Sequence, residues 1–151
     1  MPFVLGKKSE NELEGVEPRL VAVVKEAIGR SPVDFMVHDG LRTALEQKRL
    51  VASGASWTMN SKHLPQSDGF GHAVDLVPYI NGKLRWEWVP IYSIAEAMRT
   101  VAREQGLRIV WGGVWDRCLN DLEGRLDLAV KEYCERHPGP DKIDGPHYQL
   151  A

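Results

Sequence analysis

The chain has 151 residues, of which 43% are hydrophobic, and its formal net charge is −2 with a pI near 6.2. This size and composition suit one globular domain with an ordinary core, so residues 1–151 are expected to form a single domain. Nucleic-acid binders usually carry a basic stripe, and none is visible. No apolar run approaches the ~20 residues of a membrane span. The composition therefore favours neither nucleic acid nor membrane as a partner.

Helix and turn signals organise the first half of the chain. Ser9 and Glu12 have capping-box spacing, which predicts a short helix starting at Ser9. Pro18 suits the first turn of a second helix, and Thr43 is the expected cap of a third. The elements expected here are helices from Ser9, from Pro18 and over 43–52, a strand at 35–37, and a loop at 56–71 that is rich in Pro, Ser, Asp and Gly.

Strands and helices also alternate in the second half. Asn81-Gly82 is a strong hairpin signal, and Gly106 is a typical helix stop. The elements expected here are strands at 73–77, 84–86, 107–111 and 147–150, and helices at 91–105 and 122–136. The pattern predicts an α+β fold with a small, mostly antiparallel sheet flanked by helices.

Two imidazoles and a carboxylate stand out as candidate metal ligands. His63 lies in the loop, Asp75 interrupts the apolar run 73–77, and His147 begins the last strand. A catalytic zinc needs three such ligands and an open position for water. A carboxylate in an apolar run is costly to bury unless it is paired or bound to a cation. A zinc site and an ion pair with Arg42 would both meet that cost.

Asp144 is the candidate general base, because it lies just before the last of these histidines. An aspartate before glycine is also a common turn former, so its position has a purely structural reading as well.

Several motifs together resemble the zinc D-Ala-D-Ala carboxypeptidase and L-alanyl-D-glutamate endopeptidase family, in particular its small phage endolysins. The family's Ser-x-His and Gly-x-Ala-x-Asp motifs and its C-terminal acidic residue and histidine have counterparts here. So do its arginine motif, its Trp-Gly-Gly-x-Trp segment and the endolysin N-terminus. The matching stretches are Ser61-Lys62-His63, Gly71-His72-Ala73-Val74-Asp75, Asp144-Gly145-Pro146-His147, Asp39-Gly40-Leu41-Arg42-Thr43 with Glu46-Gln47, Trp111-Gly112-Gly113-Val114-Trp115-Asp116, and residues 3–10.

The resemblance implies a zinc peptidase domain with a D-Ala-D-Ala carboxypeptidase/hedgehog-like fold. It implies that His63, Asp75 and His147 hold Zn²⁺. Asp144 would accept the proton of the attacking water and return it to the leaving amine. Arg42 would stabilise the oxyanion or clamp a substrate carboxylate. The expected substrate-binding residues are Ser61, Gln47, which would also support Arg42, and Trp115, whose alternative is a place in the core.

One departure concerns the interval between two ligands. His63 and Asp75 are twelve positions apart, and this interval is shorter in many members of the family. We expect the additional residues to bulge outward as a loop. His72 is the rival ligand, but His63 keeps the Ser-x-His frame, and His72 would face the opposite side of a strand from Asp75.

The resemblance implies a monomeric phage endolysin that hydrolyses the L-alanyl-D-glutamate bond in the stem peptides of bacterial peptidoglycan. The alternatives are a D-Ala-D-Ala carboxypeptidase or dipeptidase on the same scaffold, and a non-catalytic wall-binding module. No signal peptide is visible at the N-terminus. We therefore expect the protein to accumulate in the host cytoplasm and to reach the periplasm and cell wall at lysis.

Overall fold

A five-stranded antiparallel sheet is the centre of the protein. The computed structural model describes residues 2–56, 58–140 and 142–151. Four strands lie in the order β1 (Phe35–Asp39), β2 (Ala73–Ile80), β5 (His147–Leu150) and β4 (Ile109–Trp111). The short β3 (Lys83–Leu84) pairs with the far end of β2. The fold is α+β, as the sequence predicts.

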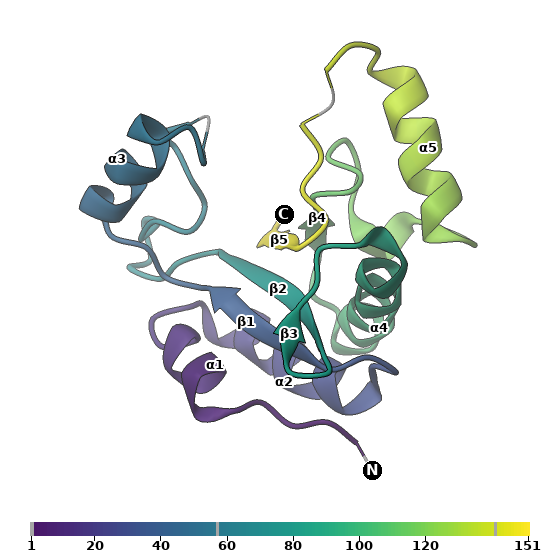
Figure 1. Ribbon diagram of the computed structural model, residues 1–151, viewed down its shortest axis with the longest axis horizontal. Helices are drawn as coiled ribbons and strands as arrows, with labels where there is room; N and C mark the ends of the chain where they lie inside the picture. The colour runs from purple at the N-terminus through teal and green to yellow at the C-terminus, as the bar shows by residue number, and fades with distance from the viewer. Residues whose placement is uncertain (1, 57, 141) are drawn as a thin grey trace.

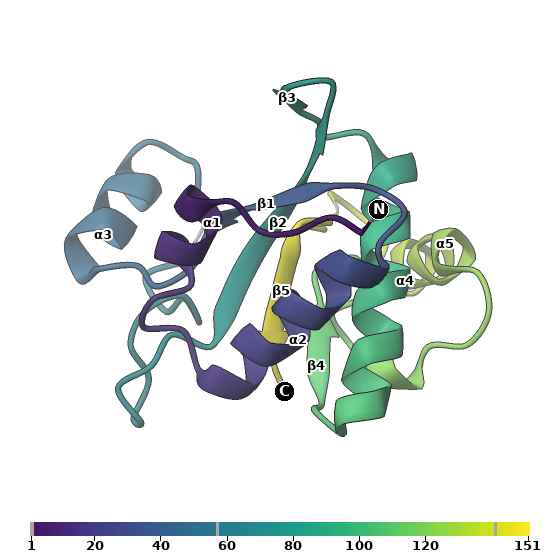
Figure 2. The same ribbon diagram turned by 90° about the horizontal axis from the view of Figure 1, so that it is seen from below.

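The helices divide between the two faces of the sheet (Figure 1). The helices α1 and α2 lie below the sheet, and α3 and α5 rise on its two sides. Seen from below, α2 and α4 run next to each other across the sheet (Figure 2). The helical elements are α1 (Lys7–Glu12), α2 (Pro18–Arg30), α3 (Ala44–Ala52), α4 (Trp88–Gln105), the 3₁₀ helix η1 (Leu119–Asp121) and α5 (Leu126–Arg136).

Strand alternation gives the sheet one apolar face and one polar face. Val74, Leu76 and Tyr148 are buried in the main core, which α2 and α4 cover. Asp75 and His147 occupy the intervening positions and are register partners. Because successive side chains on a strand point to opposite faces, the polar pair lies on the face away from the core. The residues that bury the sheet therefore also fix the orientation of the candidate ligands.

The predicted start of the first helix is wrong. The helix α1 begins at Lys7, so Ser9 lies inside it and makes no cap. The buried Ser9 hydroxyl instead accepts a hydrogen bond from the backbone N–H of Val37 at 3.0 Å. This tertiary contact fastens α1 to β1, which the local capping pattern could not reveal.

Other local signals are confirmed. Thr43 and Glu46 form a reciprocal capping box at the start of α3. Gly106 ends α4 in the left-handed region at φ 68°. Asn81 and Gly82 both have positive φ, as a tight hairpin turn requires.

Several predicted boundaries were displaced, among them the start of the strand expected at 107–111, which is β4 at Ile109–Trp111. The helix α4 begins at Trp88 instead of 91, because Pro90 is accommodated within the first turn, where no intrahelical N–H donor is needed. The helix α5 begins at Leu126 instead of 122, after the separate turn η1. The return strand β3 has only two residues and starts one position earlier than expected.

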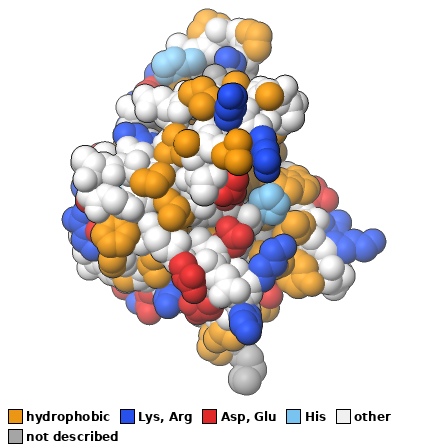
Figure 3. All heavy atoms as spheres, turned by 90° about the vertical axis from the view of Figure 1, so that its left-hand side faces the viewer, with side chains coloured by type: hydrophobic (Ala, Val, Ile, Leu, Met, Phe, Trp, Pro, Cys, Tyr) orange, Lys and Arg blue, Asp and Glu red, His pale blue; other side chains and the backbone are white. Residues whose placement is uncertain are grey.

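The surface shows no single dominant chemistry on the face drawn in Figure 3. Basic, acidic and hydrophobic side chains are interspersed there, with a histidine near the acidic groups. Among the described residues, no helix combines the length and the apolar character that crossing a bilayer demands. Cys118 and Cys134 do not form a disulfide.

Candidate metal centre and catalytic cleft

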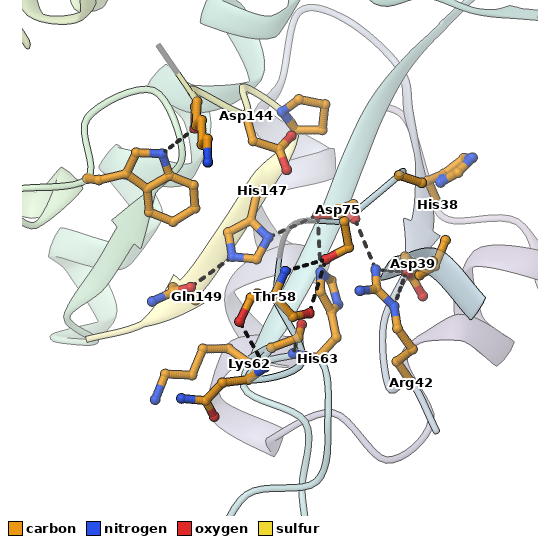
Figure 4. Close-up of a pocket in the computed structure, with 18 of the residues that line it drawn as sticks. His38, Asp39, Arg42, Thr58, Lys62, His63, Asp75, Asp144, His147 and Gln149 are labelled. Atoms are coloured by element: carbon orange, nitrogen blue, oxygen red, sulfur yellow. Dashed lines mark hydrogen bonds and ion pairs between the residues drawn. The ribbon is translucent and has the colours of Figure 1, made fainter. Parts of the chain in front are cut away.

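A cleft of about 690 Å³ opens over the polar face of the sheet. One wall comes from the end of β1, α3 and the loop that follows α3. The opposite wall comes from the segment after β4, from α5 and from the approach to β5. Asp75 and His147 lie on the floor between these walls (Figure 4). Segments that are far apart in the sequence therefore meet in one site.

Three side chains converge on the floor of the cleft. His63, Asp75 and His147 each offer a ligand atom, and these atoms lie within 4.8 Å of one another. Nε2 of His63 is 3.3 Å from Oδ1 of Asp75, and Nδ1 of His147 is 3.2 Å from the same oxygen. Both imidazoles are buried. The predicted ligand set is thus brought together, and it could hold a metal ion.

The outer nitrogens of both rings make hydrogen bonds that fix their tautomers. Nδ1 of His63 lies 2.8 Å from the carbonyl oxygen of Gly40 and must donate to it. Nε2 of His147 lies 2.9 Å from Oε1 of Gln149 and likewise donates. A neutral imidazole has one N–H, so both inner nitrogens then present lone pairs to the Asp75 carboxylate. This convergence of lone pairs needs a cation among them, and the donor set fits a metal.

The charges of the buried groups follow from the same geometry. Burial alone would raise the pKa of Asp75, but in the metal-free protein a proton on the facing nitrogens of His147 and His63 outweighs burial and holds that pKa well below its usual range. Burial would lower the pKa of His147, but the contact with Asp75 raises it. Burial, followed by the negative charge of Asp75, raises the pKa of Asp144. The site therefore contains one carboxylate held in the ionised form and a second that is more basic.

Close backbone packing positions Asp144. Its N–H donates to the carbonyl oxygen of Gly112 at 2.8 Å, and its own carbonyl accepts from the N–H of His147 at 3.0 Å. A side chain at Gly112 would place its Cβ 2.1 Å from the Asp144 carbonyl oxygen, so only glycine permits this approach. The Trp-Gly-Gly segment thus brings the Asp144 carboxylate to the cleft beside His147, a candidate ligand (Figure 4).

Gly40 has a similar role on the other side. A Cβ there would lie 1.9 Å from the carbonyl oxygen of Glu12 at the end of α1. Pressed against that helix, Gly40 turns its own carbonyl oxygen toward His63. The N–H of Arg42 donates to the carbonyl oxygen of His63 at 2.8 Å, so this candidate ligand is held through both its ring and its backbone.

The Arg42 guanidinium is buried and occupied by protein groups. It donates to Oδ2 of Asp39 through Nε at 2.9 Å and also through Nη2. Nη1 donates to Oε1 of Gln47 at 2.6 Å, and Nη2 is 3.9 Å from Oδ2 of Asp75. Gln47 is fully buried and bonds onward to Ser56. Gln47 therefore supports Arg42, and Arg42 faces the carboxylates beside the metal site.

The remaining predicted site residues lie at the cleft with different contacts. Trp115 is half-buried in the wall, 5.2 Å from His147 between ring centroids, and donates to the carbonyl oxygen of Lys142. Ser61 lines the cleft and accepts a hydrogen bond from the N–H of His63. His72 lies outside the convergent group and bonds to Asp68 instead, at 2.8 Å.

Gln149 and Lys62 are among the residues lining the cleft that sequence reasoning missed. Gln149 lies two positions after His147 on β5, and that period-two spacing is a signal that the pair shares a face. Lys62 lies between two residues of the Ser-x-His motif, and its side chain lines the cleft. No feature of the sequence distinguishes Lys62 from other surface lysines.

A small antiparallel α+β scaffold with a buried His-Asp-His group, which could hold a metal ion, and a neighbouring carboxylate is compatible with a hydrolase. Comparison with known proteins narrows this class. The model of the family described as phage L-alanyl-D-glutamate peptidase matches residues 1–150, so the chain belongs to that family. The protein is an enzyme, a peptidoglycan endopeptidase.

Individual relatives agree with this assignment. The L-alanyl-D-glutamate peptidase of Escherichia phage T5 is 33% identical over 120 residues, covering 77% of this chain and 84% of the relative. The L-alanyl-D-glutamate peptidase of Listeria phage A118 is 31% identical over 83 residues, covering 55% of this chain but 27% of that longer protein. The crystal structure of the L-Ala D-Glu endopeptidase ChiX from Serratia marcescens superposes with a TM-score of 0.73 at 36% identity, covering 98% of this chain and 90% of ChiX.

Proposed function

We propose that the enzyme is a zinc-dependent endolysin that hydrolyses the L-alanyl–D-glutamate bond of peptidoglycan stem peptides. The convergence of two tautomer-fixed imidazoles on one carboxylate carries the metal assignment. A set of two nitrogens and one carboxylate oxygen suits zinc and leaves its fourth position open. The family and the named relatives support the bond.

The roles of the protein groups follow from their places on the cleft floor. Zinc held by His63, Asp75 and His147 would supply Lewis-acid chemistry at the scissile bond, which would lower the pKa of water there toward ~7. The Asp144 carboxylate accepts the proton of the attacking water and delivers it to the leaving nitrogen. Its raised pKa suits this task, because a general base works best near the ambient pH.

Arg42 positions the carboxylates in this arrangement. Its guanidinium is committed to Asp39 and Gln47 and faces Asp75. Stabilising an oxyanion directly would require Arg42 to release one of these partners. Trp115 and Ser61 remain free to line the bound peptide, since both border the cleft.

The test combines metal content with product analysis. Metal-depleted protein should not digest purified peptidoglycan, and added zinc should restore digestion with about one equivalent bound. Mass spectrometry should identify a muramyl-L-alanine fragment and a peptide that begins with D-glutamate. Full digestion by protein with less than about a tenth of an equivalent of any metal would refute the metal-dependent mechanism. Release of terminal D-alanine alone would identify a carboxypeptidase.

We further propose that the enzyme acts as a monomer, stays in the host cytoplasm during infection and reaches the wall when the inner membrane is permeabilised. The relatives from phages T5 and A118 support a role in lysis. Expression in a bacterial host should leave cells intact until a membrane-permeabilising agent is added, and lysis should then require Asp144. Lysis without such an agent would contradict the proposed compartment, and a dimer in size-exclusion chromatography would contradict the monomer.

A further inference from the structure

Three carboxylates line the cleft, so a negatively charged substrate would bind there more readily if a cation were also present. Asp39, Asp75 and Asp144 all line it. The D-glutamate residue follows the scissile bond, and its free carboxylate is attached to the carbon that carries the leaving nitrogen. That carboxylate must therefore approach Asp144 during hydrolysis. Like charges repel, so a cation that lines the cleft would favour productive binding of this carboxylate.

Arg42 does not meet this requirement in the observed arrangement. Its side chain is about nine-tenths buried, and its donors are used by Asp39 and Gln47. A substrate carboxylate would have to displace one of these contacts to reach the guanidinium.

Lys62 meets the requirement. Its side chain is exposed and borders the cleft, and no hydrogen bond or ion pair engages its ammonium within the described part of the chain. Figure 4 shows Lys62 on the Gln149 side of the floor, away from Arg42 and Asp39. At one end of the floor the Arg42 guanidinium is already hydrogen-bonded to Asp39 and Gln47, and at the other end the Lys62 ammonium can pair with a substrate.

Hydrogen bonds fix the backbone at Lys62 and on both sides of it. Its carbonyl oxygen accepts a hydrogen bond from the N–H of His72 at 2.7 Å. On one side, the Ser61 hydroxyl bonds to the N–H of His63. On the other, His63 is fixed to Gly40. Lys62 is therefore the neighbour in sequence of a candidate metal ligand, and its long side chain borders the cleft.

We propose that Lys62 determines specificity by pairing with the free carboxylate of the D-glutamate residue. This inference rests on the proposed function and adds the group that recognises the leaving side of the substrate. Lys62 binds the carboxylate in the ground state and in the transition state alike. It therefore acts mainly on KM, whereas Asp144 acts on kcat.

A matched substrate pair isolates the interaction. One muramyl tripeptide carries D-glutamate, and the other carries D-isoglutamine, in which an uncharged amide replaces the free carboxylate. The wild-type enzyme should prefer the acid by roughly ten- to hundredfold in kcat/KM, the range expected for a hydrogen bond to a charged group. The Lys62→Gln variant should lose this preference, and Lys62→Arg should retain most of it. Added salt should weaken the preference of the wild type and of Lys62→Arg, which both carry a cation at this position, and should have no such effect on Lys62→Gln.

Controls separate recognition from other effects. The Lys48→Gln change removes an exposed lysine of α3 that does not line the cleft and should leave the preference unchanged. Zinc content should be the same in Lys62→Gln and the wild type, because the change does not touch the ligands. The Lys142→Gln change tests the other lysine of the cleft and should also keep the preference.

Three results would overturn the role of Lys62. In the first, the wild type cleaves both substrates with equal kcat/KM. In the second, Lys62→Gln lowers kcat/KM equally for both substrates. In the third, Lys142→Gln, and not Lys62→Gln, loses the preference for the acid. All three leave the endopeptidase function standing. If the zinc-loaded wild type cleaves neither substrate, the proposed function fails, and the recognition role fails with it.

Discussion

Replacing Asp144 with asparagine should separate catalysis from metal binding. The change is nearly isosteric and removes only the charge that accepts a proton. The backbone contacts of Asp144 with Gly112 and His147 do not involve its side chain and should persist. Among the described residues, no hydrogen bond of the Asp144 carboxylate is observed that the amide would break. The fold and the three ligands should therefore be retained.

The expected loss is in turnover. A missing general base lowers kcat by roughly 10²–10⁴. At about 1.36 kcal/mol for each factor of ten, this adds about 2.7–5.5 kcal/mol to the barrier. KM should change little, because the proton transfer occurs only in the transition state.

Although Asp144→Asn should lose turnover, the metal-free variant should be at least as stable as the metal-free wild type. A carboxyl whose folded-state pKa is raised disfavours the fold once it is ionised, so its contribution falls as pH rises toward that pKa. Burial and the charge of Asp75 raise the pKa of Asp144. At neutral pH, Asp144→Asn should therefore melt at the same temperature as the wild type or a higher one.

Steady-state kinetics on a defined L-Ala-D-Glu peptide, zinc analysis and thermal melts test these expectations together. The Asp127→Asn change on the exposed start of α5, outside the cleft, is a matched control and should keep wild-type turnover. Wild-type turnover in Asp144→Asn would place the base elsewhere. Loss of zinc from that variant with no other defect would make Asp144 a ligand and refute the reasoning.

Three further predictions concern the ligands and one distant ion pair. Gln149→Leu should weaken zinc binding roughly 10–100-fold in a chelator competition, because it removes the hydrogen-bond partner of His147. Gln149→Glu keeps an acceptor there and should bind zinc more tightly than Gln149→Leu. His63→Ala should lose the metal and His72→Ala should keep it; the reverse metal contents would reassign the ligand. Bonds from Arg136 hold the pKa of Asp116 down to about 2. Asp116→Asn should therefore lower the free energy of unfolding by about 1 kcal/mol at pH 7, and chemical denaturation should show this difference shrinking from pH ~4 toward 2. A difference that grew with acidity would contradict this ion pair.

The convergence of His63, Asp75 and His147 could be predicted in part because two of these residues give local signals in the sequence. Asp75 is a charged residue within an apolar strand, and His147 is the first residue of another strand, so each indicates a polar position on an otherwise buried element. The resemblance then supplied the pairing that periodicity could not. Gln149 was also within reach of the sequence, because alternate residues of a strand share a face.

The environment of Arg42 was not predictable in the same way. Its commitment to Asp39 and Gln47 depends on how α3 packs against the end of β1, and Gln47 becomes fully buried only through that packing. A similar limit explains the missed contact of Ser9, whose partner Val37 lies on another element. Side-chain partners set by tertiary packing leave no periodic trace in the sequence.

The long interval between His63 and Asp75 does not disturb the site, because the intervening residues close on themselves. Gly71 forms an antiparallel bridge with Pro65, and the N–H of Gln66 donates to the carbonyl oxygen of Phe70 at 2.9 Å. These contacts make a small hairpin whose two ends meet next to the ligand. Its length can therefore change without moving the chain on either side.

The two ligands are also anchored independently of that hairpin. His63 is fixed to Gly40 and Arg42, whereas Asp75 is fixed by its strand partners in β1 and β5. Neither anchor includes a residue from 65–70. Because His63 and Asp75 are held by different contacts, their relative position does not depend on the number of residues between them. The spacing can thus depart from that of many relatives while the convergent group is kept.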